Sequence, residues 1–256
     1  MEQQTDLVIV GAGPAGLAAA CAASDCGLEV AVVDEQASPG GQLFRHIQSP
    51  LGRSLLAPKD LRTGLELVEK FNGSGAVYYA GTTVWGLEPR AVSCTRAGKA
   101  TILPTASVII APGGMERPVP FPGWTLPGVM GAGGADILLR SGGTLPDGGP
   151  VVLAGNGPLL LLLAGHLLEK GVPIAAWLDT GLWSRRLLAA GGLPTALLDL
   201  PYLGKGLAMA LRILRSGVPR VTGVRHIRAE GERRLARVTY EAGGKTHSIE
   251  TGCLLR

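Results

Sequence analysis

The sequence contains no C-x-x-C pair, and this absence excludes a redox-active dithiol of that kind. No histidine stands near its four cysteines at the spacing of a metal site. We therefore expect free thiols, as in a reducing compartment, and no metal centre. The cysteines are Cys21, Cys26, Cys94 and Cys253.

The chain also lacks an unbroken apolar stretch of membrane-spanning length and a strong net charge. The most apolar segment, 151–168, is interrupted by Gly155–Pro158, so we expect a buried strand and helix there and no membrane span. The net charge is only +4, and the arginines of 212–237 are interspersed with glutamates, which predicts a solvated face and no nucleic-acid partner. A first apolar strand begins within seven residues of Met1, which leaves no room for a signal peptide and predicts a cytoplasmic location.

Residues 7–35 predict a βαβ unit that binds a dinucleotide. A strand runs into a G-x-G-x-x-G turn, an alanine-rich helix follows, and a second strand ends in an acidic pair. Gly11 permits the sharp turn, Gly13 lets the backbone approach a pyrophosphate, and Gly16 allows the helix to pack closely on the strand. The N–H groups and the dipole at the helix start favour the phosphate charge. Glu35, 24 positions after Gly11, would accept hydrogen bonds from the adenosine ribose.

A glycine loop and an antiparallel meander are predicted next. After Pro39–Gly41, the side chains of Gln42 and Arg45 either contact the ligand or belong to an ordinary surface turn. Residues 46–59 have no regular pattern, whereas 61–72 have helical spacing. The meander comprises predicted strands at 76–79, 82–87, 91–95 and 100–103.

An apolar strand at 107–111 ends at Pro112–Gly114, at the carboxyl edge of the predicted parallel sheet, where ligands bind in this kind of fold. The proline-rich stretch 116–129 is predicted to be an extended crossing between domains, with Phe121 and Trp124 as packing anchors. A short helix at 133–141 and a linker at 142–149 follow.

Residues 151–179 repeat the opening pattern. Gly155 and Gly157 stand in a second glycine turn, and Asp179 lies 24 positions after Gly155. Leu160 replaces the third glycine, so this copy either binds a nucleotide or is a scaffold that has lost its ligand. If it binds, Asp179 favours NAD over NADP, because a 2′-phosphate would meet a carboxylate. ADP or ATP would also fit this turn.

The whole pattern predicts an α/β fold with two Rossmann-like three-layer dinucleotide-binding domains, the first of which carries the antiparallel meander. We place the first domain at 1–145 and the second, NAD(P)-type domain at 146–256. Beyond Asp179, helices are predicted at 182–190, 193–200 and 204–216, and antiparallel strands at 221–227, 235–240 and 245–250.

Several motifs together resemble the FAD-dependent pyridine-nucleotide-disulfide-oxidoreductase superfamily. Within it, the chain is most similar to the FAD-binding subunits of opine oxidases, hydrogen cyanide synthase and heteromeric hydroxyproline or proline dehydrogenases. The resemblance covers most of the chain. It rests on GAGPAG at 11–16, VVDEQ at 32–36, PGGQLFR at 39–45, VIIAPGG at 108–114, ERPVPFPGWTLPGVMGAGGA at 116–135 and GNGPLLLL at 155–162.

The resemblance implies FAD in the first domain. The pyrophosphate would lie on the first glycine turn and the ribose on Glu35, with Gln42 near the ribityl chain and Val84 at the adenine. Pro112 replaces the threonine of the superfamily's Ala-Thr-Gly turn, so a contact from that hydroxyl is lost. The implied first-site residues are Gly11, Gly13, Pro14, Ala15, Gly16, Glu35, Gln36, Gly41, Gln42, Val84, Ala111, Pro112 and Gly113, and the second-site residues are Gly155, Gly157 and Asp179.

The resemblance also implies an oxidoreductase subunit that helps to oxidise a C–N bond of a small amino-acid-derived substrate, and its partner would be a second oxidoreductase subunit. No residue is identified as catalytic. The superfamily's return segment to the FAD domain would begin near Arg256, so we expect it to be missing or supplied by another polypeptide. The alternatives are a non-catalytic nucleotide-binding scaffold and a thioredoxin-reductase-like NAD(P)H:acceptor flavin reductase without a redox dithiol.

Overall fold

The computed structural model describes residues 5–56, 58–142, 145, 150–181, 192 and 200–256. The chain forms two compact units, each with buried apolar clusters of its own. The first unit contains Met1–Met115 with Arg140–Gly143, and the second contains Glu116–Leu139 with Thr144–Arg256.

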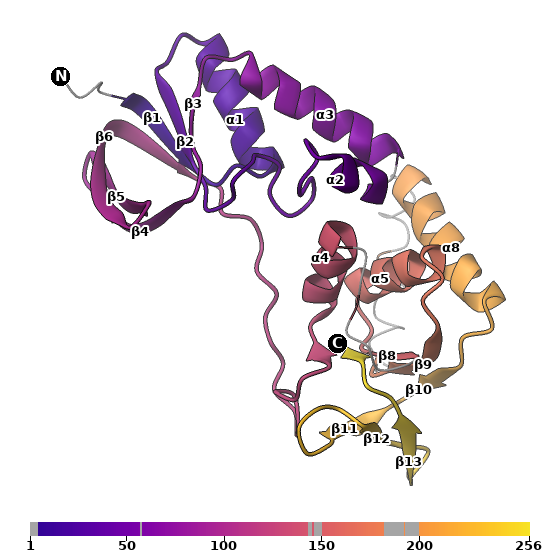
Figure 1. The fold of residues 1–256 in the computed structure, drawn as a ribbon. Coiled ribbons are helices and arrows are strands. Elements are labelled where there is room, and N and C mark those ends of the chain that lie inside the picture. Colours follow the sequence, from indigo (N-terminus) through magenta and orange to yellow (C-terminus); the bar gives the residue numbers. More distant parts are fainter. Residues whose placement is uncertain (1–4, 57, 143–144, 146–149, 182–191, 193–199) are drawn as a thin grey trace. The chain divides into compact units, whose positions relative to one another are not determined.

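A mixed sheet with the strand order β3-β2-β1-β6-β5-β4 forms the centre of the first unit (Figure 1). The strands are β1 (Thr5–Val10), β2 (Val30–Val33), β3 (Val77–Tyr79), β4 (Thr82–Glu88), β5 (Ala91–Arg96) and β6 (Lys99–Ile110). β6 pairs in parallel with β1 along its second half and antiparallel with β5 along its first half. The predicted strands at 100–103 and 107–111 are therefore one continuous strand, and β3 belongs to the parallel part of the sheet, where it pairs with β2, rather than to the meander.

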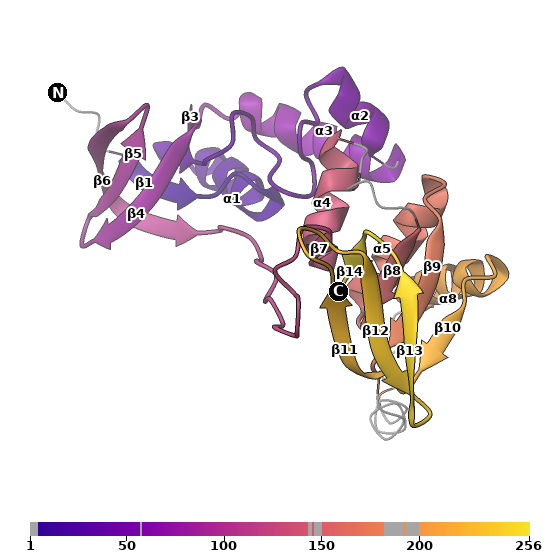
Figure 2. The ribbon, with the colours of Figure 1, turned by 60° about the horizontal axis from the view of Figure 1, so that its bottom comes forward.

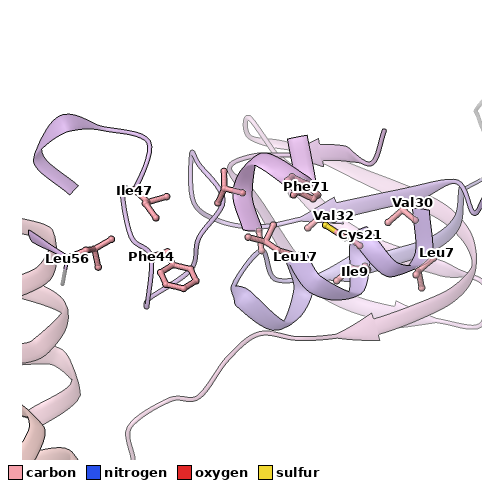
Figure 3. Close-up of a cluster of buried hydrophobic side chains, with 13 residues drawn as sticks. Leu7, Ile9, Leu17, Cys21, Val30, Val32, Phe44, Ile47, Leu56 and Phe71 are labelled. Carbon is pink, nitrogen blue, oxygen red and sulfur yellow. The ribbon is translucent and has the colours of Figure 1, made fainter. Parts of the chain in front are cut away.

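Alternate residues of the parallel strands face two different layers, as the pleat of a strand requires. Leu7 and Ile9 of β1 lie in a buried cluster with residues of α1 (Pro14–Asp25) and α3 (Pro58–Asn72) (Figure 3). Val8, between them, packs with Val92 of the meander. The helices thus cover one face of the sheet and the meander covers the other, which confirms the predicted three-layer α/β arrangement.

One helix of the first unit was not predicted. Residues 46–59 contain α2 (Pro50–Leu55), which begins after Ser49. The Ser49 hydroxyl accepts a hydrogen bond from the Gly52 N–H at 3.0 Å, and Pro50 occupies the first helical turn, where its missing N–H costs nothing. This cap explains why a short helix forms without an apolar period in the sequence.

The second unit is built in the same way around a parallel sheet with the order β10-β9-β8-β14-β7 (Figure 2). Its elements are β7 (Val129–Met130), α4 (Ala132–Gly142), β8 (Val151–Ala154), α5 (Pro158–Glu169), β9 (Ile174–Asp179), α8 (Leu200–Arg215), β10 (Arg220–Thr222), β11 (Arg225–Glu230), β12 (Arg237–Ala242), β13 (Lys245–Glu250) and β14 (Leu254–Leu255). The strands β11, β12 and β13 form a separate antiparallel sheet, which confirms the antiparallel strands predicted at 235–240 and 245–250. The strand predicted at 221–227 is divided between β10, which pairs in parallel with β9, and β11.

The core of the second unit again has two sides. Val151 and Leu153 of β8 pack with the helices, in a cluster that includes Leu163 of α5. Val152, between them, packs with the antiparallel sheet, in a cluster that includes Val238 of β12. The internal repeat in the sequence therefore corresponds to two structurally similar units.

The segment 116–139 belongs to the second unit, because β7 pairs with β14. The sequence analysis placed this segment in the first domain. The predicted boundary between the FAD-binding domain (1–145) and the NAD(P)-type domain (146–256) stays a prediction. The predicted helix at 182–190 and nearly all of that at 193–200 lie outside the described residues, as does most of the predicted linker at 142–149. In the part of the chain that the structure describes, no helix is long and apolar enough to cross a membrane.

Candidate functional site

A cavity of about 500 Å³ lies at the carboxyl ends of β1, β2 and β6 in the first unit. Eleven of the predicted first-site residues line it: Gly11, Gly13, Pro14, Glu35, Gln36, Gly41, Gln42, Val84, Ala111, Pro112 and Gly113. Ala15 and Gly16, in the first turn of α1, do not line it. Arg45, Thr82 and Asp34 also contribute to its wall. The structure gathers these residues from five separate segments, while their individual roles toward a cofactor stay predictions.

Each of the three glycines of the first turn is glycine for a different structural reason. Gly11 has φ +104°, and a Cβ there would strike the backbone of Ala111 at the end of β6. A Cβ on Gly16 would strike the Gly11 carbonyl, so this glycine allows α1 to approach β1 closely. Gly13 differs, because among the described residues that are not its chain neighbours a Cβ would meet only the Gly41 Cα, at 4.0 Å. The chain therefore leaves space at Gly13 that its own packing does not need, as a cradle for a ligand requires.

Asp34 is a site residue that the sequence interpretation missed. Its carboxylate accepts the Ala12 N–H at 2.5 Å and the Gln36 N–H at 2.7 Å, and so ties the end of β2 to the glycine turn. Glu35 lines the cavity with an exposed side chain. The sequence did show two adjacent acids after the strand, and counting positions from the first glycine selected only the second of them.

These two carboxylates give a prediction that separates their roles. Asp34→Asn is expected to weaken FAD binding about tenfold or more and to lower the unfolding temperature, because an amide offers one acceptor oxygen to two N–H groups. Glu35→Gln is expected to weaken FAD binding about tenfold through the ribose and to leave the unfolding temperature unchanged, because the side chain is exposed. Titration of FAD into the apoprotein, with thermal unfolding alongside, measures both. Wild-type affinity in Glu35→Gln would contradict the ribose role.

Polar groups around Gln36 order one wall of the cavity. Arg45 donates to the Gln36 side-chain oxygen at 2.8 Å, and the Tyr78 hydroxyl donates to the Gln36 carbonyl at 2.9 Å. Burial, followed by the negative charge of Asp34, raises the pKa of Tyr78, so this hydroxyl keeps its proton and remains a donor. Gln42 donates to the Gly114 carbonyl at 3.4 Å. The loop 39–45 is therefore tied to the site rather than being a free surface turn.

The second glycine turn is arranged differently. Gly155 has φ +144°, but Leu160 is buried in the helix-side cluster, and its Cδ2 would lie 3.3 Å from a Cβ on Gly155. The side chain of Asp179 is 0% exposed and accepts from the Gly181 N–H at 2.8 Å and from Arg220 at 2.6 Å. Arg220 also stacks on Trp177, 5.1 Å from the ring centroid. The carboxylate predicted to hold a ribose is thus engaged by residues of the chain itself.

The thiols do not contribute to the first-unit cavity. Cys21, Cys94 and Cys253 are buried, and burial raises the pKa of each, that of Cys253 to about 11. Cys26 is exposed. No group of acidic, histidine and cysteine side chains among the described residues is placed to hold a metal ion.

We expect Cys26 to react rapidly with a thiol reagent such as Ellman's reagent in the folded protein, and the three buried thiols to react only after unfolding. Cys26→Ser should then remove the fast phase. The number of thiols that react after denaturation should fall from four to three. A second fast thiol would contradict the burial seen here.

Comparison with known proteins agrees with this architecture. Residues 5–169 match the family described as pyridine nucleotide-disulphide oxidoreductase. The chain is 44% identical to an opine oxidase subunit of Agrobacterium tumefaciens (strain Ach5), over 98% of this chain and 51% of that protein. It is 32% identical to hydrogen cyanide synthase subunit HcnB of Pseudomonas aeruginosa, over 91% of this chain and 50% of that protein.

Among solved structures, the L-proline dehydrogenase from P. horikoshii superposes with a TM-score of 0.65 at 18% identity, over 99% of this chain and 41% of that chain. This likeness concerns the fold alone. The chain spans about half the length of the curated relatives it matches. By the match over 5–169, the chain belongs to the pyridine nucleotide-disulphide oxidoreductase family of FAD-dependent oxidoreductases.

Proposed function

We propose that this chain is the FAD-binding part of a heteromeric amine or amino-acid dehydrogenase or oxidase of the opine type, which acts on a C–N bond. The observation that carries the proposal is the open position at Gly13, in front of a cavity of about 500 Å³. The similarity to proteins named as subunits of opine oxidase and hydrogen cyanide synthase supports the reaction class and the need for a partner polypeptide.

FAD, when bound, supplies the redox chemistry, and the protein contributes binding and orientation. The start of α1 offers unpaired N–H groups and the positive end of a helix dipole to the pyrophosphate. Glu35 would hold the ribose, and the Asp34 carboxylate fixes the turn on which the pyrophosphate would lie. Gln42, Ala111, Pro112 and Gly113 would line the path toward the flavin ring.

The visible spectrum of the purified chain after incubation with FAD tests this function. We expect a retained flavin chromophore after gel filtration and, with the partner polypeptide present, bleaching of that chromophore by an amino-acid-derived amine. A chain that takes up no FAD would overturn the proposal.

A non-catalytic nucleotide-binding scaffold is the second candidate, and the ion pair of Asp179 with Arg220 in the second turn favours it. In that case FAD would bind, but neither NADH nor the partner's substrate would bleach it. NAD, ADP or ATP at Gly155 and Gly157 stays a proposal, supported by the open space around Gly157. The four free cysteines are consistent with the cytoplasmic location that we retain as part of the proposal.

A further inference from the structure

Gln36 lies in the wall of the first-unit cavity, directly after the end of β2. In the sheet, β1 stands between β2 and β6, so the glycine turn that follows β1 lies between the ends of its two neighbours. A dinucleotide with its pyrophosphate on that turn extends one half toward β2 and the other toward β6. In folds of this kind the acidic end of the second strand meets the ribose of the adenosine half. Gln36, next to Glu35, therefore stands on the adenosine side of the cavity.

The chain itself occupies every polar group of Gln36 except its side-chain NH2 group. The N–H donates to Asp34 at 2.7 Å, the carbonyl accepts from the Tyr78 hydroxyl at 2.9 Å, and the side-chain oxygen accepts from Arg45 at 2.8 Å. The side-chain NH2 group has no hydrogen-bond partner among the residues that the structure describes. Because Gln36 lines the cavity, this group is available to a ligand.

Arg45 fixes which way round the Gln36 amide stands. An arginine side chain only donates hydrogen bonds, so the atom of the amide that faces it must be the oxygen. The NH2 group is then directed away from Arg45, and it can only donate. The packing of the loop holds Arg45 in place, because the neighbouring Phe44 is 4% exposed in the helix-side cluster (Figure 3). Gly64 of α3 leaves room for the Phe44 ring, which a Cβ at that position would meet at 2.8 Å.

We propose that Arg45 is a positioning residue for the dinucleotide. It holds the Gln36 amide with its N–H groups toward the ligand, and these groups donate to an acceptor atom of the adenosine half. The carboxylate of Glu35 offers only acceptors, so the two side chains present a donor beside an acceptor. A ribose hydroxyl takes part in both kinds of hydrogen bond, and an adenine ring has acceptor nitrogens. The inference rests on the proposed FAD site and adds how that site recognises the adenosine end.

Calorimetric titration of the apoprotein with FAD and with ADP measures this contact. Gln36→Met keeps the length of the side chain but has no N–H group, and Arg45→Met removes the group that orients the amide. We expect each variant to bind both ligands about fivefold more weakly, the size of one neutral hydrogen bond. The fold loss should be equal for the two ligands, because ADP contains the whole adenosine half. Unchanged ADP affinity in either variant would overturn the proposal.

The double variant separates positioning from a direct effect of the arginine charge. If Arg45 acts through Gln36, Arg45→Met has no further effect in the Gln36→Met background. The double variant then binds ADP about fivefold more weakly than the wild type, whereas independent effects would multiply to about twenty-fivefold and would refute the assignment. Arg45→Lys keeps a donor for the Gln36 oxygen and is expected to retain most of the affinity.

Gln48→Met is the matched control, because Gln48 is exposed and does not line the cavity. Its affinity for ADP should equal that of the wild type. Titration with 2′-deoxy-ADP identifies the acceptor: a smaller effect of Gln36→Met on this ligand than on ADP assigns the 2′-hydroxyl, and an equal effect assigns the adenine ring or the 3′-hydroxyl. Wild-type ADP affinity in the Gln36 and Arg45 variants would refute this inference alone. A wild-type chain that binds neither FAD nor ADP would refute the proposed function as well.

Discussion

Gly13→Asp is expected to remove bound FAD and to leave the protein folded. Gly13 has φ −74° and ψ 179°, an extended conformation that any residue adopts. In the part of the chain that the structure describes, and leaving its chain neighbours aside, a Cβ there meets no atom closer than 4.0 Å. Gly13 occupies the N-cap position of α1, where no side chain accepts a hydrogen bond from the first N–H groups of the helix. An aspartate there would supply such an acceptor. The same side chain and charge would occupy the place of the pyrophosphate. We expect at least a hundredfold loss of FAD affinity, about 3 kcal/mol, with no loss of thermal stability.

The internal repeat supplies a matched control. Gly157 is the N-cap of α5, with φ −84° and ψ 162°, and also lacks a side-chain cap. Gly157→Asp should therefore have the same effect on helix stability and none on flavin content. The ratio of flavin to protein after gel filtration, with thermal unfolding of both variants, gives the result. Wild-type flavin content in Gly13→Asp would mean that the pyrophosphate lies elsewhere.

Arg220→Met is expected to destabilise the second unit. Asp179 is 0% exposed, and its Oδ2 lies 2.6 Å from the Arg220 guanidinium. Removal of the guanidinium leaves a buried carboxylate without that charge and also removes the stacking on Trp177. Because the Gly181 N–H still bonds to one carboxylate oxygen, we expect a loss of about 2–4 kcal/mol in the free energy of unfolding.

Arg212→Met is the control for this change. Arg212 pairs with Glu169, but the two side chains are 55% and 53% exposed, so the pair is screened by water. We expect a loss below about 1 kcal/mol for this variant. Denaturant unfolding of both variants measures the difference. Equal effects of the two substitutions would show that burial of Asp179 does not set the strength of its ion pair.

The first site was predictable because its central part is local in sequence. Strand, glycine turn, helix and acidic strand end lie within 7–35, and each has a backbone requirement that the residue types reveal. In the more distant wall, the apolar strand at 107–111 already placed Pro112 and Gly113 at the ligand edge of the sheet. The position of Val84 came from the family resemblance, because no local pattern relates that residue to the turn. The cavity contains both sets, since β6 lies directly beside β1.

The second turn shows where counting along the sequence fails. Glu35 and Asp179 each lie 24 residues after the first glycine of their turn, so the sequence analysis treated them as equivalent. In the structure, Gly11 donates to the Val33 carbonyl and Gly155 donates to the Leu178 carbonyl, so Asp179 corresponds to Asp34 instead. The pairing of β8 with β9 shifts by one residue after Val151, and this extra residue of β9 produced the coincidence in spacing.

The sequence by itself determined the two glycine turns, the layered α/β units and the absence of a redox dithiol, because these depend on residue types at short range. Only the tertiary structure decided which carboxylate stands beside each turn. That choice depends on strand register and on Arg220, which lies 41 residues beyond Asp179 in the chain and reaches it through the pairing of β10 with β9. Ion pairs between distant segments have no periodicity in the sequence, so their partners become known only when the strands are aligned.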